Sequence, residues 1–337
     1  EGLKAGEIDL IQENSSKNWA RNHQGKRWED GTLVKALLPH QNGAGWQGFA
    51  MNTRRPLFQD KRVRQALGLA MDFEWMNRQL FFNLYQRSPS YFTNTELAAT
   101  GKPDARELTV LHELQTRFGD KVPAEIFDDI PPPPSTLPPH SLRDNPRQAR
   151  ELLAQAGWNS RDGALRNAQG EPFQFEMMLE DRMQERASAP YARNLEKLGI
   201  AMTYRIYDAA LLQRKAENFD YDMVWALMSG SQSPGNELFG YFASSSRDQP
   251  GSDNAMGVAD PVIDALLARI VQAEKRDELV TLVRVLDRML RLGYYIVPHF
   301  YSNAHRVSYR HTLAFPQVLP QFYRIEDWSV TTWWMKP

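Results

Sequence analysis

Residues 46–72 read WQGFAMNTRRPLFQDKRVRQALGLAMD, and the argument about the fold starts from this stretch. Residues 47–52 are predicted to form a strand, because glycine precedes the run and Arg54-Arg55-Pro56 follows it. Asp60 is predicted to cap a helix, because its carboxylate can accept hydrogen bonds from the free N–H groups of the first turn. The apolar side chains that follow share one helical face: Val63, Ala66, Leu67, Ala70 and Met71.

Strands and helices continue to alternate along the rest of the chain. Further strands are predicted at residues 33–38, 173–179, 202–206, 221–227 and 294–301. Further helices are predicted at 145–156, 191–198 and 208–217, and two more begin at Asp260 and Asp277. Asn145 is expected to cap the first of these helices, and Gly157 and Gly293 are each expected to end one. This alternation predicts an α/β fold whose sheet is largely covered.

Residues 81–145 break the pattern. Their periodicity is weak, and they contain the proline runs 131–134 and 138–139, which favour extended backbone. We expect a long surface excursion that serves as a rigid loop. The alternative is that the proline run is a ligand for an aromatic groove, which would make the chain a structural interaction module.

Bulk composition excludes several classes of protein. A chain of 337 residues is more than one compact core usually holds, so two lobes are expected. Forty basic residues against forty-one acidic ones leave a net charge of −1, without the basic excess of a nucleic-acid binder. No apolar run approaches the ~20 residues that a bilayer span needs. The absence of cysteine excludes disulfides, thiolate catalysis and cysteine-ligated zinc.

No motif points to a cofactor, a metal or a catalytic centre. Residues 43–48 match the dinucleotide fingerprint formally, but they lead into a strand rather than a helix, so a chance match is favoured. The seven histidines show no metal-ligand spacing. Residues 229–235 are rich in hydroxyls but form no nucleophile elbow. A hydrolase, for example a murein peptidase, stays an alternative that rests on this loop and on ordinary carboxylates.

Aromatic residues are the notable feature of the composition, at 11% of the chain. Several of them lie in loop-like segments beside polar groups. Such side chains either fill gaps in a large core or line a cleft for a ligand with apolar and polar parts. The residues in question are Tyr85, Tyr91, Phe92, Phe239, Tyr241 and Phe242.

Four stretches carry a resemblance to a known family: residues 6–9 (GEID), 52–72, 145–158 and 254–264, the last followed by a helical pair and Ile296-Val297-Pro298. In this order they resemble the extracellular solute-binding proteins of family 5, the dipeptide and oligopeptide type. Residues 87–99 and 233–237 are most similar to the YejA branch, which is linked to the import of peptides, murein peptides and peptide antibiotics.

The resemblance implies a periplasmic-binding-protein-like fold of class II, a venus flytrap with a mixed sheet and flanking helices. In the family the Gly-x-Ile-Asp stretch lies near mid-chain, so this chain is expected to be a C-terminal portion. Residues 1–45 would be a remnant of lobe 1, and residues 307–337 a return to it. Residues 46–306 would form lobe 2, with hinge strands at 46–52 and 297–306. Without lobe-1 partners, Trp328, Trp333 and Trp334 are expected to be exposed or packed on a neighbouring chain.

The resemblance also implies a function. The chain would belong to the substrate-binding component of an ABC importer, which binds oligopeptides in the periplasm and hands them to a permease in the inner membrane. No enzymatic activity, cofactor, metal or nucleic-acid partner is expected. The protein is expected to be a monomer. An extended peptide can bond to a strand edge through its backbone, and the strand ending near Trp225 is the expected edge.

Nine residues are candidates for contact with the ligand: Arg87, Tyr91, Trp225, Ser229, Ser231, Asn236, Glu237, Asn254 and Tyr301. Arg87 would meet a ligand carboxylate, and Tyr91 and Trp225 would offer flat apolar faces. Classical relatives place an aspartate after the strand tryptophan to pair with the peptide amine, but residues 226–231 contain no acid. Glu237 is the nearest candidate substitute, and the competing interpretation is that it caps or pairs locally. Arg87, Tyr91, Trp225, Asn236 and Glu237 are expected to converge on one concave surface.

Overall fold

The computed structural model describes residues 2–139, 141 and 143–337. Its centre is a five-stranded sheet of order β10-β3-β9-β7-β8. Strand β3 runs antiparallel to β10 and β9, whereas β7 runs parallel to both β8 and β9. The predicted α/β class with a mixed sheet is therefore confirmed. The strands are β3 (Trp46–Met51), β7 (Gln174–Leu179), β8 (Ala201–Ile206), β9 (Met223–Met228) and β10 (Ile296–Pro298).

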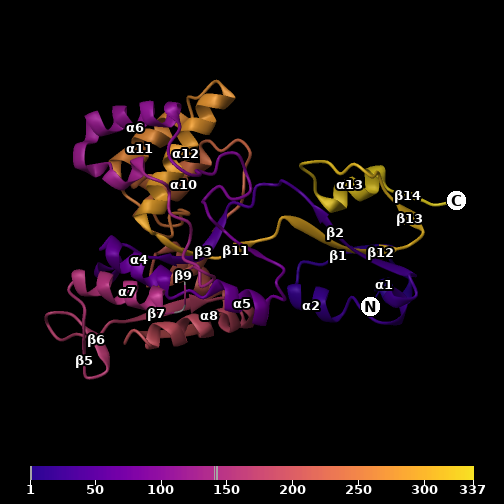
Figure 1. The fold of residues 1–337 in the computed structure, drawn as a ribbon, viewed down its shortest axis with the longest axis horizontal. Coiled ribbons are helices and arrows are strands. Elements are labelled where there is room, and N and C mark those ends of the chain that lie inside the picture. Colours follow the sequence, from indigo (N-terminus) through magenta and orange to yellow (C-terminus); the bar gives the residue numbers. More distant parts are fainter. Residues whose placement is uncertain (1, 140, 142) are drawn as a thin grey trace.

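Helices cover both faces of this sheet (Figure 1). One face packs against α6 (Ala105–Phe118), α10 (Glu237–Phe242), α11 (Pro261–Ile270) and α12 (Arg276–Gly293). The other packs against α4 (Lys61–Leu69), α5 (Phe73–Leu80), α7 (Asp144–Gln155) and α8 (Arg182–Glu196). Helix α9 (Ala209–Glu217) and a hairpin of β5 (Asn159–Arg161) and β6 (Ala164–Arg166) complete this part. None of the helices described is long and apolar enough to cross a membrane.

The opening stretch folds as predicted. The Asp60 carboxylate accepts the N–H of Arg62 at 2.9 Å and so caps α4. One other predicted helix end is wrong. Asn145 lies inside the first turn of α7 and its side chain donates to the Ser135 carbonyl. Helix α12 ends at Gly293 as predicted, and the next residue, Tyr294, takes the left-handed conformation with a φ of 51°.

Residues 81–145 are not a surface excursion, and that prediction is wrong. They contribute α6 and the strand β4 (Gln86–Arg87), which pairs with β11 (Phe300–Tyr301). Buried charges on α12 hold the segment in place. Arg288 donates to the Glu107 carboxylate at 2.8 Å, and Asp287 accepts the backbone N–H groups of Tyr91 and Ala99 at 2.9 and 3.0 Å. These partners lie far apart in sequence, so local periodicity could not show them.

The two terminal segments form a second, smaller unit on the opposite side from α7 in Figure 1. Its sheet has the order β1-β12-β2, and α13 packs on it around Tyr323 and Trp328. Its elements are α1 (Gly2–Ala5), β1 (Leu10–Gln12), α2 (Ser16–Arg21), α3 (Lys26–Glu29), β2 (Leu33–Pro39), β12 (Ala304–Arg310), β13 (Leu313–Ala314), α13 (Ile325–Thr332) and β14 (Trp334–Met335).

The three C-terminal tryptophans of this unit differ in exposure. Trp334 is half exposed, as expected. Trp328 is 7% exposed and Trp333 stacks on Phe315, so the expectation is wrong for Trp328. The reason is that the N-terminal and C-terminal segments cover each other, because β12 lies between β1 and β2.

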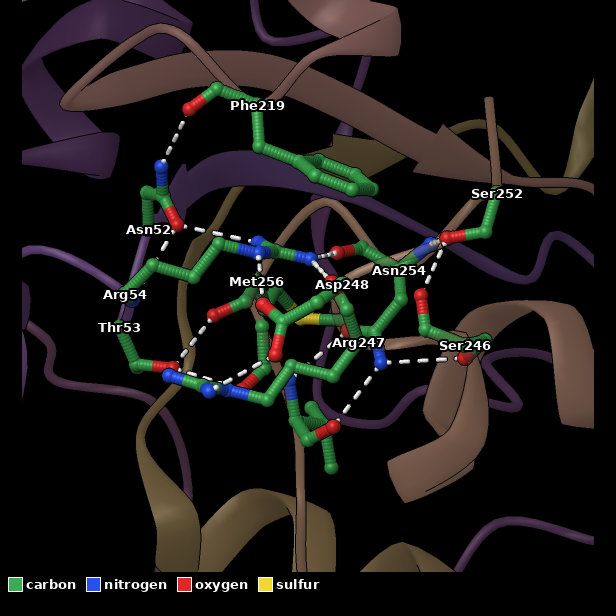
Figure 2. A network of polar contacts seen from close by, with 12 residues as sticks. Asn52, Thr53, Arg54, Phe219, Ser246, Arg247, Asp248, Ser252, Asn254 and Met256 are labelled. Atoms are coloured by element: carbon green, nitrogen blue, oxygen red, sulfur yellow. Dashed lines mark hydrogen bonds and ion pairs between the residues drawn. The ribbon is translucent and has the colours of Figure 1, made fainter. Parts of the chain in front are cut away.

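A polar network joins two of the stretches that carried the family resemblance (Figure 2). The Thr53 N–H donates to the Met256 carbonyl at 2.9 Å, and its hydroxyl lies 2.8 Å from the same oxygen. The Arg54 guanidinium donates to the Asn254 carbonyl at 2.9 Å and lies 3.6 Å from the centre of the Phe219 ring. Residues 52–54 and 254–257 therefore lock the end of β3 to the loop before α11.

Asn254 is the best satisfied residue of this network. Its side chain is fully buried, accepts the Val258 N–H at 2.8 Å, and donates to the Val258 carbonyl at 2.9 Å. We expect Asn254→Ala to lower the free energy of unfolding by about 2–4 kcal/mol, because it leaves several buried polar groups without partners. Asn236→Ala is the matched control on an exposed asparagine and should change it by less than about 0.5 kcal/mol. Urea denaturation followed by circular dichroism measures both; equal effects would contradict the prediction.

Candidate ligand-binding cleft

Two cavities of about 510 and 260 Å³ share Gln47 and Phe300 in their walls, and together they are called the cleft here. The larger cavity is bounded by the start of α8, by residues 80–85 and by residues 14–17 at the start of α2. The smaller one lies among residues 44–47, 227–229 and 300–302, at the ends of strands. The cleft therefore faces both the large unit and the terminal unit.

Trp225 forms part of the wall of the larger cavity, and two neighbouring rings hold its indole in place. Its ring meets Phe49 edge-on at 5.6 Å between centroids and His299 at 4.3 Å. Gln47 is fixed as well, since its side chain donates to the Phe300 carbonyl at 2.6 Å and its carbonyl accepts the His299 N–H at 2.9 Å. The cleft thus has a rigid wall of one indole, one phenyl ring and one amide.

Strand β9 leaves an edge open beside Trp225. All six of its residues pair with β3, but only Met223 and Val224 pair with β7. From Trp225 to Met228 the β7 side of β9 has no strand partner among the described residues, and Leu227 is 59% exposed. A free strand edge can accept an added extended chain through backbone hydrogen bonds.

Two titratable groups lie buried next to this wall without hydrogen-bond partners in the described part of the chain: Arg87 and His299. None of the three guanidinium nitrogens of Arg87 has a hydrogen-bond partner among the described residues. Burial lowers the pKa of this group to about 10. Burial, and secondarily the positive charge of Arg87, hold the pKa of His299 well below its usual range. His299 is therefore neutral at neutral pH, and Arg87 keeps its charge.

Three of the nine predicted ligand contacts line the cleft. Trp225 lies in the wall of the larger cavity, and Ser229 and Tyr301 lie in that of the smaller one. Ser229 is exposed, and the Tyr301 hydroxyl donates to the Gln86 amide oxygen at 2.8 Å. Arg87 does not line either cavity, although Phe300, its partner across the β4–β11 ladder, lines both.

Tyr91 and Asn254, two of the predicted ligand contacts, lie away from the cleft. Tyr91 is 2% exposed and packs in the core on the opposite side of the sheet from Trp225, where its ring meets Trp46 edge-on at 5.7 Å. Asn254 is fully buried in the network of Figure 2, and protein groups engage both atoms of its amide. The amide of Asn254 thus serves the loop, and Tyr91 lines a different cavity from the two that form the cleft.

Ser231, Asn236 and Glu237 lie in the loop before α10 and at its start, and they do not line the cleft. The Glu237 carboxylate accepts the Gly235 N–H at 3.0 and 3.1 Å, which is the local role weighed as the alternative to an amine anchor. The Ser231 hydroxyl accepts the Ser233 N–H at 3.1 Å. The expected convergence of Arg87, Tyr91, Trp225, Asn236 and Glu237 on one concave surface is therefore not found.

The sequence of the chain matches a known family. Residues 1–250 match the model of the bacterial extracellular solute-binding proteins, family 5, middle region. The chain belongs to this family. The family-5 chain is 36% identical to the probable peptide-binding protein YejA of Agrobacterium fabrum over 325 residues, which are 96% of this chain and 52% of that protein. The resemblance to the YejA branch is thereby confirmed.

Two further comparisons extend this result. The family-5 chain is 33% identical to the peptidoglycan-binding protein YepA of Agrobacterium fabrum over 342 residues, which cover 99% of this chain and 54% of that protein. It spans about half the length of the curated relatives it matches. Among solved structures, the oligopeptide-binding protein AppA from Bacillus subtilis, in complex with a nonapeptide, superposes with a TM-score of 0.70 at 18% identity. That match covers all of this chain and 57% of AppA, and it shows the fold.

Several residues of the family-5 cleft were not predicted. Gln47 and Phe300 lie in predicted strands, where an inward side chain is the ordinary expectation. Tyr85 had a signal, since it is an aromatic residue in a loop-like segment. Lys17 and Arg186 had no such signal in the sequence, because a single cation on a helix is most often a solvated surface residue.

The two buried arginines of the family-5 chain allow a contrast. Arg288 bonds to Glu107, Gly101 and Thr100, whereas the guanidinium of Arg87 has no hydrogen-bond partner among the residues that the structure describes. We expect Arg288→Met to lower the free energy of unfolding by about 3–5 kcal/mol, because it leaves Glu107 buried without its counter-charge. Arg87→Met should leave it unchanged or raise it by about 1–2 kcal/mol, because it removes an unpaired buried charge. Urea denaturation compares the two; a loss at Arg87 as large as that at Arg288 would contradict this account.

Proposed function

We propose that the family-5 chain forms the second lobe, with parts of the first, of an oligopeptide-binding component of an ABC importer. The observation that carries the proposal is the open edge of β9 at residues 225–228. This edge begins at Trp225, whose side chain forms part of the wall of the cleft. A peptide added there would bond through its backbone, and its side chains would occupy the two cavities. Such binding favours peptides as a class over any single side chain.

The division into lobes is part of this proposal. Residues 1–45 and 307–337 would belong to lobe 1, and residues 46–306 to lobe 2, with hinge strands at 46–52 and 297–306. In support, the segment from β2 to β3 and the segment from β11 to β12 both pass between the two sheets, and they are bonded to each other from the His40 N–H to the Asn303 carbonyl at 2.9 Å. Closure of the lobes would then shut the cleft over its ligand.

The family and the relatives also support a location and a set of partners. A periplasmic location, a permease in the inner membrane as the partner, and a monomeric state fit an extracellular solute-binding protein. A peptide ligand is supported by the YejA relative, which is described as a probable peptide-binding protein, and by AppA, whose structure contains a nonapeptide. The relative YepA, described as peptidoglycan-binding, supports murein peptides as one group of ligands.

The hydrolase and interaction-module alternatives receive little support. The Ser231 hydroxyl of the hydroxyl-rich loop accepts a backbone N–H of its own loop, and no group of metal-ligating side chains is found among the residues described. The proline run 131–134 lines a cavity of about 170 Å³ against Arg64, Tyr91 and Tyr294, and the Pro131 carbonyl accepts a hydrogen bond from Arg291. These prolines make contacts within the chain, which favours a structural role over that of a ligand for another protein.

Trp225 provides the test of peptide binding. We expect Trp225→Ala to weaken the binding of a free tripeptide at least tenfold (~1.4 kcal/mol), because the indole is a rigid aromatic wall of the cleft. Trp334→Ala is the control, since Trp334 is half exposed and lies in the terminal unit. Isothermal titration calorimetry measures both variants.

Two results would overturn the proposal. One is equal loss of affinity in both tryptophan variants, which would remove the cleft as the binding site. The other is cleavage of the tripeptide, detected by mass spectrometry after incubation with the protein, which would favour the hydrolase.

A further inference from the structure

The lining of the larger cavity includes one positively charged side chain from each of the two units. Lys17 belongs to α2 of the terminal unit, and Arg186 belongs to α8 of the large unit. Both residues are exposed, and neither makes an ion pair or a side-chain hydrogen bond with any residue that the structure describes. On the same helix, Arg182 does have a partner, since it meets Glu185 at 3.1 Å. Both cations that line the cavity are therefore available to a ligand.

A third cation lies beneath the same cavity. Arg306 of β12 is 6% exposed and lies 5.2 Å from the ring of Tyr85, which lines the cavity. It donates to the carbonyl of Asn14, also in the wall, but its buried Nη1 has no partner within the described ranges. A buried charge with unused donors attracts an anion more strongly than an exposed one, because solvent screens it less.

Carboxylates are missing from the walls. Neither cavity has an aspartate or a glutamate among its lining residues. The acids nearby in sequence are engaged elsewhere: Glu13 accepts the Ser15 N–H at 2.8 Å and lies 3.4 Å from His23, and Glu185 pairs with Arg182. A chain with a net charge of −1 thus has a cleft whose walls carry only positive charge. Such walls concentrate anions at the site.

We propose that the cleft binds acidic peptides, and that a ligand carboxylate sits between Lys17 and Arg186. This inference rests on the proposed function as a peptide binder and names the chemical class of its ligand. The guanidinium of Arg186 can hold a carboxylate through two parallel N–H donors, and the ammonium of Lys17 adds a third donor from the other unit. The free strand edge of β9 holds the peptide backbone, and the two cations select a carboxylate on a ligand side chain.

The placement of the two cations gives the carboxylate a second effect. Because Lys17 and Arg186 belong to different units, their like charges oppose approach of the two walls when the cleft is empty. A carboxylate between the two cations attracts both of them, so the net electrostatic interaction between the two walls becomes favourable. An acidic ligand therefore stabilises the closed arrangement more than a neutral ligand of the same shape does, and this difference is what shifts the equilibrium.

The test uses two tripeptides that differ by one charge, Ala-Glu-Ala and Ala-Gln-Ala, and isothermal titration calorimetry on the 337-residue chain. The acidic peptide should bind at least tenfold more tightly. Lys17→Gln and Arg186→Gln should each remove most of this preference, measured as the ratio of the affinities for the two peptides. Lys26→Gln on α3 and Arg193→Gln on α8 are the controls, since both residues are exposed, carry the same charges and do not line the cleft.

Failure of this inference can be told apart from failure of the proposed function. If both peptides bind equally well, or if the control variants lose the preference as well, the carboxylate site is wrong and peptide binding stands. If neither peptide binds, the peptide proposal falls, and titration with succinate decides the carboxylate site by itself. Succinate should then shift the NMR signal of the Arg186 side-chain Nε–H and leave that of Arg193 in place; no shift at Arg186 overturns the site.

Discussion

The side chains of β3 alternate between two hydrophobic cores. The need to fill both cores at once determines how the neighbouring helices and strands pack around β3. Trp46 and Ala50 pack with α10 to α12, whereas Phe49 and Met51 pack with α4, α5 and α8. A strand buried on both faces cannot shift by one residue without exchanging its two sets of side chains. The network of Asn52, Thr53 and Arg54 fixes the point where the strand ends, and the polar side chains of this recognisable stretch bond to the protein itself.

The position of the cleft follows from where the neighbouring strands stop. Strand β7 ends at Leu179, while β9 continues to Met228 and β3 starts beside it at Trp46. The three strands have six residues each, but β7 is staggered against β9 by its register, and this stagger leaves one end of β9 without its β7 neighbour, in the place where open α/β sheets commonly bind ligands. Trp225 lies at the first position beyond the last β7 pair, so the register of two strand ladders sets the position of the aromatic wall.

Sequence reasoning succeeded where local chemistry decides the structure. The strand β3, the Asp60 cap and the buried face of α4 follow from side chains within a few residues of one another. It failed for α6, which depends on the ion pair between Glu107 and Arg288 from a distant helix. It also failed for Asn254, because an asparagine inside a recognisable stretch can serve a ligand or the loop itself, and only its four surrounding protein contacts distinguish these roles.

The cleft was only partly predictable for the same reason. Of the predicted ligand contacts, Trp225, Ser229 and Tyr301 line the two cavities, and they lie at or just beyond the ends of predicted strands. Lys17 and Arg186 lie 169 positions apart, and no local pattern distinguishes either from an ordinary surface cation. Their common environment exists only after the terminal unit has docked beside α8.

The pair of connections between the two sheets has a mechanical consequence. Two backbone segments that run side by side and are bonded to each other bend together easily, but they resist rotation about their common direction, because one would have to wind around the other. Under the proposed division into lobes, relative movement of the two units would then be close to rotation about a single axis. Residues on one wall would return to the same partners on the other wall at each closure, so the proposed peptide ligand would meet the same pair of surfaces each time.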